Sequence, residues 1–202
     1  MAQSRSNFRV LMAAVLLCGM PASAQRERAV NPPTVSVCEL FKDLRSYAGK
    51  MVSVRGLMYS GRETFALGGQ CKSRFTTRYS PATPAVPSVA QRQLEYVWTA
   101  AVDLADAAMI TRGEEPVDFQ TDDEMVNQTY ARIKSEQAKL GGAEKTTVWV
   151  TVVGKLRVRD HYDVVQIADG TWRGVGYGHL GMYPGQLVIK TMSDPLVERK
   201  KD

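Results

Sequence analysis

Two segments of this 202-residue chain show the same alternation of apolar and polar residues, and each is interrupted by a glycine. Such alternation, over residues 50–60 and 146–159, is typical of a β-strand with one buried face. Gly56 interrupts the first segment and Gly154 the second, at the same phase of the pattern. A glycine inside a strand usually marks a bulge or a sharp bend. The two segments therefore predict a small and strongly curled sheet.

The N-terminus has the features of a secretory signal peptide. Arg5 and Arg9 precede an apolar run from Val10 to Leu17, and Ala22-Ser23-Ala24 supplies small residues for cleavage. The apolar run is shorter than the roughly 20 residues that span a bilayer. We expect a signal peptide over residues 1–24 and a periplasmic or secreted mature chain with no membrane span. Lipidation of Cys18 is the alternative, which the large residue before it disfavours.

The mature chain is mildly basic and of a length that suits one domain. Loss of Arg5 and Arg9 leaves 24 basic against 21 acidic side chains, a net charge of +3. This charge is too small to indicate a nucleic-acid partner, and none is expected. We expect a flexible lead-in over residues 25–34, a single domain over 35–193 that can bury a core, and a charged tail over 194–202.

Cys38 and Cys71 are the cysteines that remain after removal of the signal peptide. Two cysteines in an oxidising compartment usually pair. We therefore predict a disulfide bond between them, which would fasten the leading helix to the sheet.

Helix signals occur in two places. Each begins with a capping box, in which a hydroxyl residue is followed three positions later by Glu. The two boxes are Ser36 with Glu39 and Thr121 with Glu124. The first predicts a helix that ends at Gly49, and the second a helix that ends at Gly141-Gly142.

Residues 94–108 fit two patterns. Every third or fourth residue is apolar, as in a helix, yet Trp98, Ala100, Val102 and Leu104 also alternate as in a strand. With the strand interpretation, three strands precede the second helix and two follow it, the last over residues 186–193. This order predicts a mainly β fold with helices. It is a small OB-like five-stranded barrel with an N-terminal helix and a helix between strands three and four.

Three segments resemble a group of exported bacterial proteins to which no activity is assigned. They are Tyr47–Gly56, Trp98–Leu104 and the Gly176–Leu180 run before Gln186-Leu187-Val188. The resemblance covers most of residues 35–193. It implies an OB-like barrel and carries no catalytic residues with it.

Catalytic signals are weak. The sequence has no Gly-x-Ser-x-Gly elbow, no His-Glu-x-x-His and no phosphate-binding Gly-x-x-x-x-Gly-Lys-Ser/Thr. A metal site at Asp160–Asp163 with His179 is disfavoured, because the spacing is not that of a known ligand set. We expect no catalytic residue, no metal and no cofactor. A small hydrolase that uses Asp160, Asp163 and Asp169 is the alternative.

A binding surface on the barrel is the favoured interpretation. Tyr59 and Trp149, with Phe65 and Trp98 as further candidates, could stack on a ligand. The basic side chains that alternate along the same strands are Arg55, Lys155 and Arg157. We expect a non-enzymatic envelope module that binds a partner protein or a glycan, although fold-level analogy alone supports this ligand class.

The glycine-rich segment 174–185 is expected to be structural. Five glycines leave it little side-chain area, so His179 is predicted to anchor it by hydrogen bonds, and Tyr177 and Tyr183 to supply its apolar packing.

Overall fold

The computed structural model describes residues 32–60, 65–80, 93–110, 117–159, 163–166, 172–178 and 181–200. For 74–80, 93–98, 109, 163–166 and 172–173 the backbone alone is described. The chain divides into two units, Met1–Val30 and Asn31–Asp202, and all described residues belong to the second. The expected signal peptide and most of the expected lead-in lie outside them.

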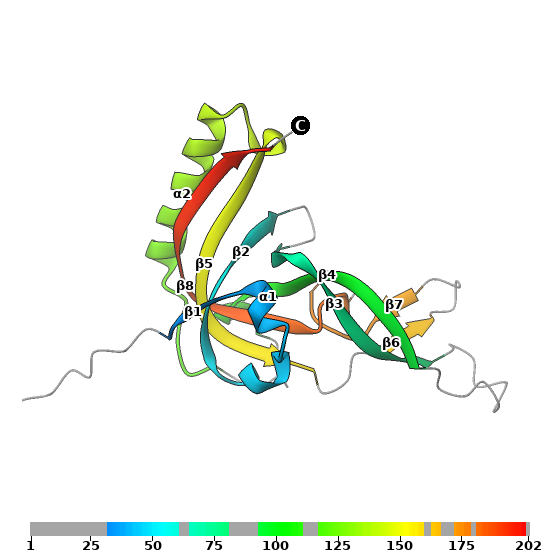
Figure 1. Ribbon diagram of the computed structural model, residues 1–202. Helices are drawn as coiled ribbons and strands as arrows, with labels where there is room; N and C mark the ends of the chain where they lie inside the picture. The colour runs from blue at the N-terminus through cyan, green and yellow to red at the C-terminus, as the bar shows by residue number, and fades with distance from the viewer. Residues whose placement is uncertain are drawn as a thin grey trace, which may run out of the picture. The chain divides into compact units, whose positions relative to one another are not determined.

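The described part is mainly β with helices, as the sequence predicts. Its longer elements are the strands β2, β3, β4, β5 and β8 and the helix α2 (Figure 1). In chain order the elements are β1 (Thr34–Ser36), α1 (Val37–Leu40), η1 (Leu44–Tyr47), β2 (Met51–Ser60), β3 (Phe65–Ser80), β4 (Gln93–Asp106), η2 (Ala107–Met109), α2 (Asp123–Lys139), η3 (Ala143–Lys145), β5 (Thr146–Val158), β6 (Asp163–Gln166), β7 (Trp172–Gly174) and β8 (Gly185–Arg199).

Five of the strands pair in a closed ring. β2 pairs antiparallel with β3 and with β5, and β3 pairs antiparallel with β4. β5 pairs antiparallel with β8, and β8 closes the ring through a parallel pairing with β4. β1 adds to β2 in parallel, while β6 and β7 extend the sheet beyond β3.

The core lies inside this ring and under the helices. Its side chains include Val54 and Leu67 from β2 and β3, Val102 from β4, Val152 from β5 and Leu187 from β8, all fully buried. Burial of each such side chain stabilises the fold by about 1.5–3 kcal/mol. The alternation seen in the sequence thus reflects one inward face on each ring strand.

The two strand glycines lie where the backbone of a neighbouring strand comes close. A Cβ atom on Gly56 would lie 2.9 Å from the carbonyl oxygen of Gly68, and one on Gly154 would lie 2.1 Å from that of Val188. At Gly154 the pairing of β5 with β8 also shifts its register. The curl that the sequence predicts is therefore accompanied by close approach of adjacent strands.

Residues 94–108 form a strand over most of their length, as β4. Ala100, Val102 and Leu104 all lie in the core. Alternate residues share one face in a strand, whereas in a helix they would not. Pairing with β3 on one edge and β8 on the other favours the strand over the helical propensity of the alanines.

The leading helix is shorter than predicted. The Ser36–Glu39 capping box is present and opens α1, but α1 ends at Leu40. A separate 3-10 helix, η1, then begins after Asp43, whose side chain accepts a hydrogen bond from the backbone N–H of Ser46. This competing cap explains why the apolar stripe is not one continuous helix.

Two predicted strand boundaries are wrong. A Gly-Gly pair usually marks a turn, and the sequence therefore predicts one at Gly68-Gly69, but this pair lies inside β3, where the pairing with β4 shifts register between Gly68 and Lys72. The last strand continues to Arg199 instead of ending at Ser193. A register shift and a positive φ of 50° at Asp194 let β8 pass Pro195, which has no N–H to donate. Much of the expected charged tail is therefore strand.

α2 lies along the part of β8 that no longer pairs with β4 (Figure 1). The N-cap is Asp122, not the predicted Thr121, because Asp122 accepts a hydrogen bond from the N–H of Met125. The Thr121 hydroxyl instead donates to the carbonyl of Ile189 at 2.8 Å. Further along, the Thr129 hydroxyl donates to the carbonyl of Met192 at 2.7 Å. Thr121, just before α2, and Thr129, within it, thus satisfy two backbone carbonyls of β8.

Replacing Thr129 with Val is expected to lower the free energy of unfolding by about 1–3 kcal/mol. Thr129 is buried, so the change leaves the Met192 carbonyl without its hydrogen bond and out of reach of water. Urea denaturation of the two proteins measures the loss. Thr129→Ser keeps the hydroxyl and should lose less. Equal stability of Thr129→Val and wild type would show that the contact does not hold α2 to β8.

Candidate functional site

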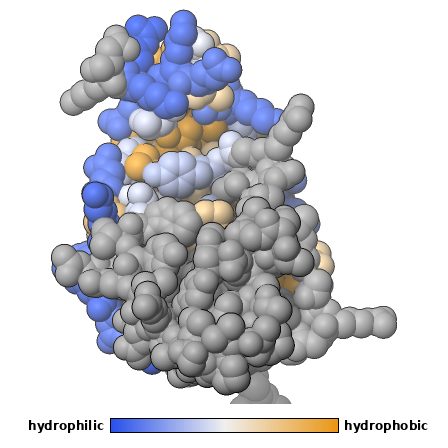
Figure 2. Space-filling view, turned by 90° about the vertical axis from the view of Figure 1, so that its right-hand side faces the viewer, coloured by the Kyte–Doolittle hydropathy of each residue, from blue (hydrophilic) through white to orange (hydrophobic). Residues whose placement is uncertain are grey.

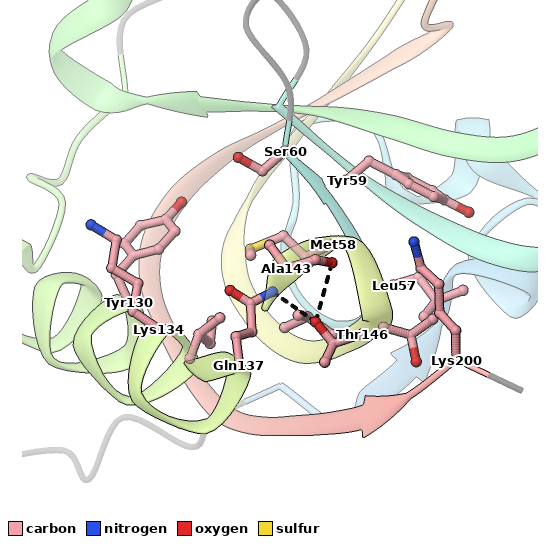
Figure 3. A pocket seen from close by; sticks show the side chains of 13 residues that line it. Leu57, Met58, Tyr59, Ser60, Tyr130, Lys134, Gln137, Ala143, Thr146 and Lys200 are labelled. Atoms are coloured by element: carbon pink, nitrogen blue, oxygen red, sulfur yellow. Dashed lines mark hydrogen bonds between the residues drawn. The ribbon is translucent and has the colours of Figure 1, made fainter. Parts of the chain in front are cut away.

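A cavity of about 630 Å³ opens between α2 and the ends of β2 and β5 (Figure 3). We call it the helix–strand cavity. Its walls come from four parts of the chain and from the residue that follows β8. The residues that line it are Leu57, Met58, Tyr59, Ser60, Tyr130, Ile133, Lys134, Gln137, Ala143, Thr146, Thr147, Val148 and Lys200.

Divergence of two neighbouring strands creates this cavity. β2 and β5 pair from Met51↔Lys155 as far as Leu57↔Trp149 and then separate. β2 continues to Ser60 beside β3, while β5 extends back to Thr146 beside β8. In Figure 1 the end of β2 turns away from β5. The helix α2 closes one side of the opening.

The floor of the cavity is apolar and its border is polar. Ile133 and Val148 are 2% and 4% exposed, and Leu57 and Met58 lie beside them. Figure 2 shows apolar surface in a hollow on one face of the molecule, with hydrophilic groups along its upper border. A volume of this size and an apolar floor with a few polar groups are typical of ligand sites.

The polar groups of the cavity are mostly neutral hydrogen-bonding groups. The Gln137 side-chain amide donates to the Thr146 hydroxyl at 3.2 Å, which in turn lies 3.2 Å from the Ala143 carbonyl (Figure 3). Burial raises the pKa of Tyr130 to about 12. Its hydroxyl therefore stays protonated, and able to donate, at physiological pH.

Among the described residues that line the cavity, lysines supply the only charges. Lys134 projects from α2, and Lys200 follows β8. The described residues that line the cavity include no carboxylate, no histidine and no cysteine. The polar part of this lining thus consists of hydroxyl, amide and ammonium groups.

The predicted binding residues do not all meet at one site. Tyr59 lines the cavity and is 43% exposed, and Trp149 pairs with Leu57 at the point where the strands separate. Arg55 lies further into β2, where its guanidinium donates to the Thr151 hydroxyl at 3.3 Å and to the Asp194 carbonyl. Arg55 therefore fixes the bulge in β8 where it passes Pro195. Of the two further stacking candidates, Phe65 packs against the core, and the side chain of Trp98 lies outside the described part of the chain.

Lys155 and Arg157 lie toward the opposite end of β5. Eight residues separate Trp149 from Arg157, which is about 25 Å along a strand. The Arg157 guanidinium lies 5.7 Å from the centre of the Tyr177 ring, and the Arg159 guanidinium lies 4.8 Å from the same centre. Arg157 and Arg159 thus pack around Tyr177. Neither they nor Lys155 line the helix–strand cavity.

Tyr177 and Tyr183 are joined by two backbone hydrogen bonds, of 2.7 and 3.1 Å. Tyr177 is 8% exposed. These contacts are compatible with the expected packing of the glycine-rich segment, and the structural role of the two tyrosines stays a prediction. His179, the predicted anchor, lies outside the described residues, as do Asp160, His161 and Asp169.

A buried carboxylate that sequence reasoning missed lies near this segment. Asp103 is 7% exposed and accepts a hydrogen bond of 2.8 Å from the Gln186 side-chain amide. The amide oxygen of Gln186 accepts in turn from Arg157 at 3.1 Å. A Cβ atom on Gly178 would lie 2.5 Å from the Asp103 carboxylate, so the glycine segment packs directly on it. The only sequence signal was an acidic residue within an alternating strand.

Burial raises the pKa of Asp103 above its ordinary value of 3.8, and the hydrogen bond from Gln186 opposes this only in part. Ionisation is therefore harder in the folded chain than in the unfolded one, and the free energy of unfolding should fall as pH rises from about 4 through the raised pKa. Asp103→Asn should remove this fall. Urea denaturation from pH 3.5 to 7.5 measures it, and parallel curves for the two proteins would contradict it.

The other findings concern absences. Among the described residues, no three side chains of His, Cys, Asp or Glu come together as a metal site would require. Within the same residues, no helix is long and apolar enough to cross a membrane. No protein family, curated protein or solved structure matches this chain.

The cavity residues that the sequence did not identify come mainly from α2 and the end of the chain. Tyr130 and Ile133 lie on the apolar stripe of the second helix, and Lys134 and Gln137 follow at helical spacing beside it. Lys200 was assigned to the charged tail. An apolar stripe with a tyrosine, an amide and a lysine along its border was the one available signal.

Proposed function

We propose that this chain is an exported, non-enzymatic binding module that holds a partner protein at the helix–strand cavity. The observation that carries the proposal is the composition of that cavity. It combines an apolar floor with hydroxyl, amide and ammonium groups, and its described lining holds no carboxylate, histidine or cysteine.

The strand ring supports an OB-like barrel as the framework. The order β2, β3, β4, β8, β5 with a parallel pairing between β4 and β8 is a five-stranded Greek-key ring. α2 lies between the third and fourth of these strands along the chain. The resemblance to exported bacterial proteins points to the same fold.

Two observations support a location in the periplasm or outside the cell. A disulfide joins Cys38 and Cys71, and such bonds persist in oxidising compartments. The sequence also begins with a charged, then apolar, then small-residue pattern typical of a cleaved leader.

A glycan is the second candidate ligand. Tyr59 is 43% exposed and lines the same cavity as the hydroxyl and amide groups. An exposed aromatic face beside hydrogen-bonding groups is a common arrangement for sugar binding. The hydrolase alternative gains no support from the cavity, because Asp163 lies in β6 and the other two aspartates lie outside the described residues.

Photo-crosslinking tests the proposal. The mature protein would carry benzoylphenylalanine in place of Tyr59, with the same group at the exposed Val175 as the control position. We expect a discrete protein adduct from envelope extract at position 59, competed away by unmodified protein, and none at 175. Glycan-array binding without such an adduct would favour the glycan. The absence of both a protein adduct at position 59 and glycan-array binding would overturn the binding function.

A further inference from the structure

In the part of the chain that the structure describes, the edges of β2 and β5 that face the helix–strand cavity lack a strand neighbour. Pairing between the two strands stops at Leu57↔Trp149. Beyond it, Met58–Ser60 pair with β3 and Thr146–Val148 pair with β8, each on the other edge. Within residues 32–60 and 117–159, the backbone pairings place no strand between these two edges.

Side chains, not a strand, occupy the space beside these edges. Gln137 of α2 reaches the hydroxyl of Thr146, not its backbone. The Thr146 N–H donates to the carbonyl of Ala143, so this one group is already satisfied. A strand edge with unpaired N–H and C=O groups is a template for an added strand from another chain.

The charge at the cavity favours an acidic occupant. Lys134 and Lys200 line it from opposite walls, and no carboxylate is among its described lining residues. Glu198 lies across from Thr147 on β8 but does not line the cavity. Complementary charge increases the association rate and disfavours partners of the wrong sign.

An apolar row continues from the cavity across the sheet. Leu57 pairs with Trp149, which pairs with Leu196 on the far side of β5. Leu196 is 48% exposed. A partner segment in the cavity would therefore find apolar surface both beneath it and beside it.

We propose that the partner contributes an extended, acidic segment, which adds as a β-strand between β2 and β5 in the helix–strand cavity. Apolar side chains on one face of the segment contact Met58 and Val148, which share a face of the sheet, and acidic side chains reach Lys134 and Lys200. The inference rests on the proposed function and specifies the chemistry of the partner.

Selection of binders to the full mature protein from a displayed library of random octapeptides tests whether the bound segment is acidic. We expect enrichment of sequences that alternate apolar and acidic residues. The best synthetic peptide should bind the double variant Lys134→Glu/Lys200→Glu with about tenfold lower affinity than it binds wild type. Lys42→Glu/Lys50→Glu changes the net charge equally at exposed positions away from the cavity and should bind like wild type. Basic or charge-independent enrichment, or equal binding to both double variants, would overturn the proposal.

Hydrogen exchange tests strand addition. Amides in residues 58–60 and 147–148 should gain protection when the selected peptide is bound, and N-methylation of alternate peptide residues should abolish the gain. Binding without protection would overturn strand addition. If the crosslink at position 59 still captures a partner in that case, the proposed function survives, whereas loss of the crosslink as well removes both.

Discussion

Replacing Cys38 and Cys71 together with serine is expected to lower the free energy of unfolding by about 3–4 kcal/mol. The bond closes a loop of 33 residues, and opening it increases the conformational entropy of the unfolded chain. It also joins the leading helix α1 to β3, because Cys38 follows the first residue of α1 and Cys71 lies within β3. Guanidinium denaturation of wild type and the double variant measures the difference.

Reductant provides the internal control for this prediction. Dithiothreitol should lower the melting temperature of wild type toward that of Cys38→Ser/Cys71→Ser and leave the double variant unchanged. A wild-type melting temperature that does not respond to reductant, in protein shown by alkylation to be reduced, would contradict it. The Cα atoms are 5.9 Å apart, within the usual range for the bond, so the cross-link fits the folded backbone.

The parts of the fold that were predictable rest on local signals. Alternation identified β2 and β5, and the Ser36–Glu39 box identified the start of α1. The disulfide followed from cysteine count and compartment. Each of these depends on neighbouring residues or on composition, so one sequence was enough to predict them.

The errors in the fold arise where distant contacts override local signals. Gly68-Gly69 looks like a turn, but pairing with β4 and close packing against Tyr59 and Cys38 keep it in a strand. Pro195 and the charged residues after it suggest that the last strand ends before them, but β5 pairs with β8 as far as Arg199. No short-range pattern contains this information.

The candidate site was less predictable than the fold for the same reason. Tyr59 was identified because it is an aromatic residue on a strand, and Trp149 lies close to the same cavity. Lys155 and Arg157 share the face of β5 with Trp149 but lie far along it, so strand alternation alone grouped them wrongly. The cavity itself depends on where β2 leaves β5, and that point is set by the tertiary pairing.

Gly154 is the position where a single added methyl group should do the most harm to the ring. A Cβ atom there would lie 2.1 Å from the backbone oxygen of Val188 and 2.9 Å from its carbonyl carbon. Side chains can rotate away from such a contact, but this oxygen belongs to the strand that pairs with β5 through Lys155↔Val188. Relief of the clash therefore requires β5 and β8 to move apart at the centre of the ring.

Gly154→Ala is accordingly expected to lower the free energy of unfolding by about 3 kcal/mol, at the upper end of overpacking effects. Gly185→Ala is the matched control, because a Cβ there meets the Arg157 oxygen and the Val102 side chain only at 3.4 Å, an ordinary contact distance. Urea denaturation of both variants and wild type compares them. Because the ring holds the diverging ends of β2 and β5, Gly154→Ala should also weaken peptide binding at the cavity, while Gly185→Ala should not. A Gly154→Ala protein as stable as wild type would mean that β5 and β8 are not held in the close register that the curl of the ring requires.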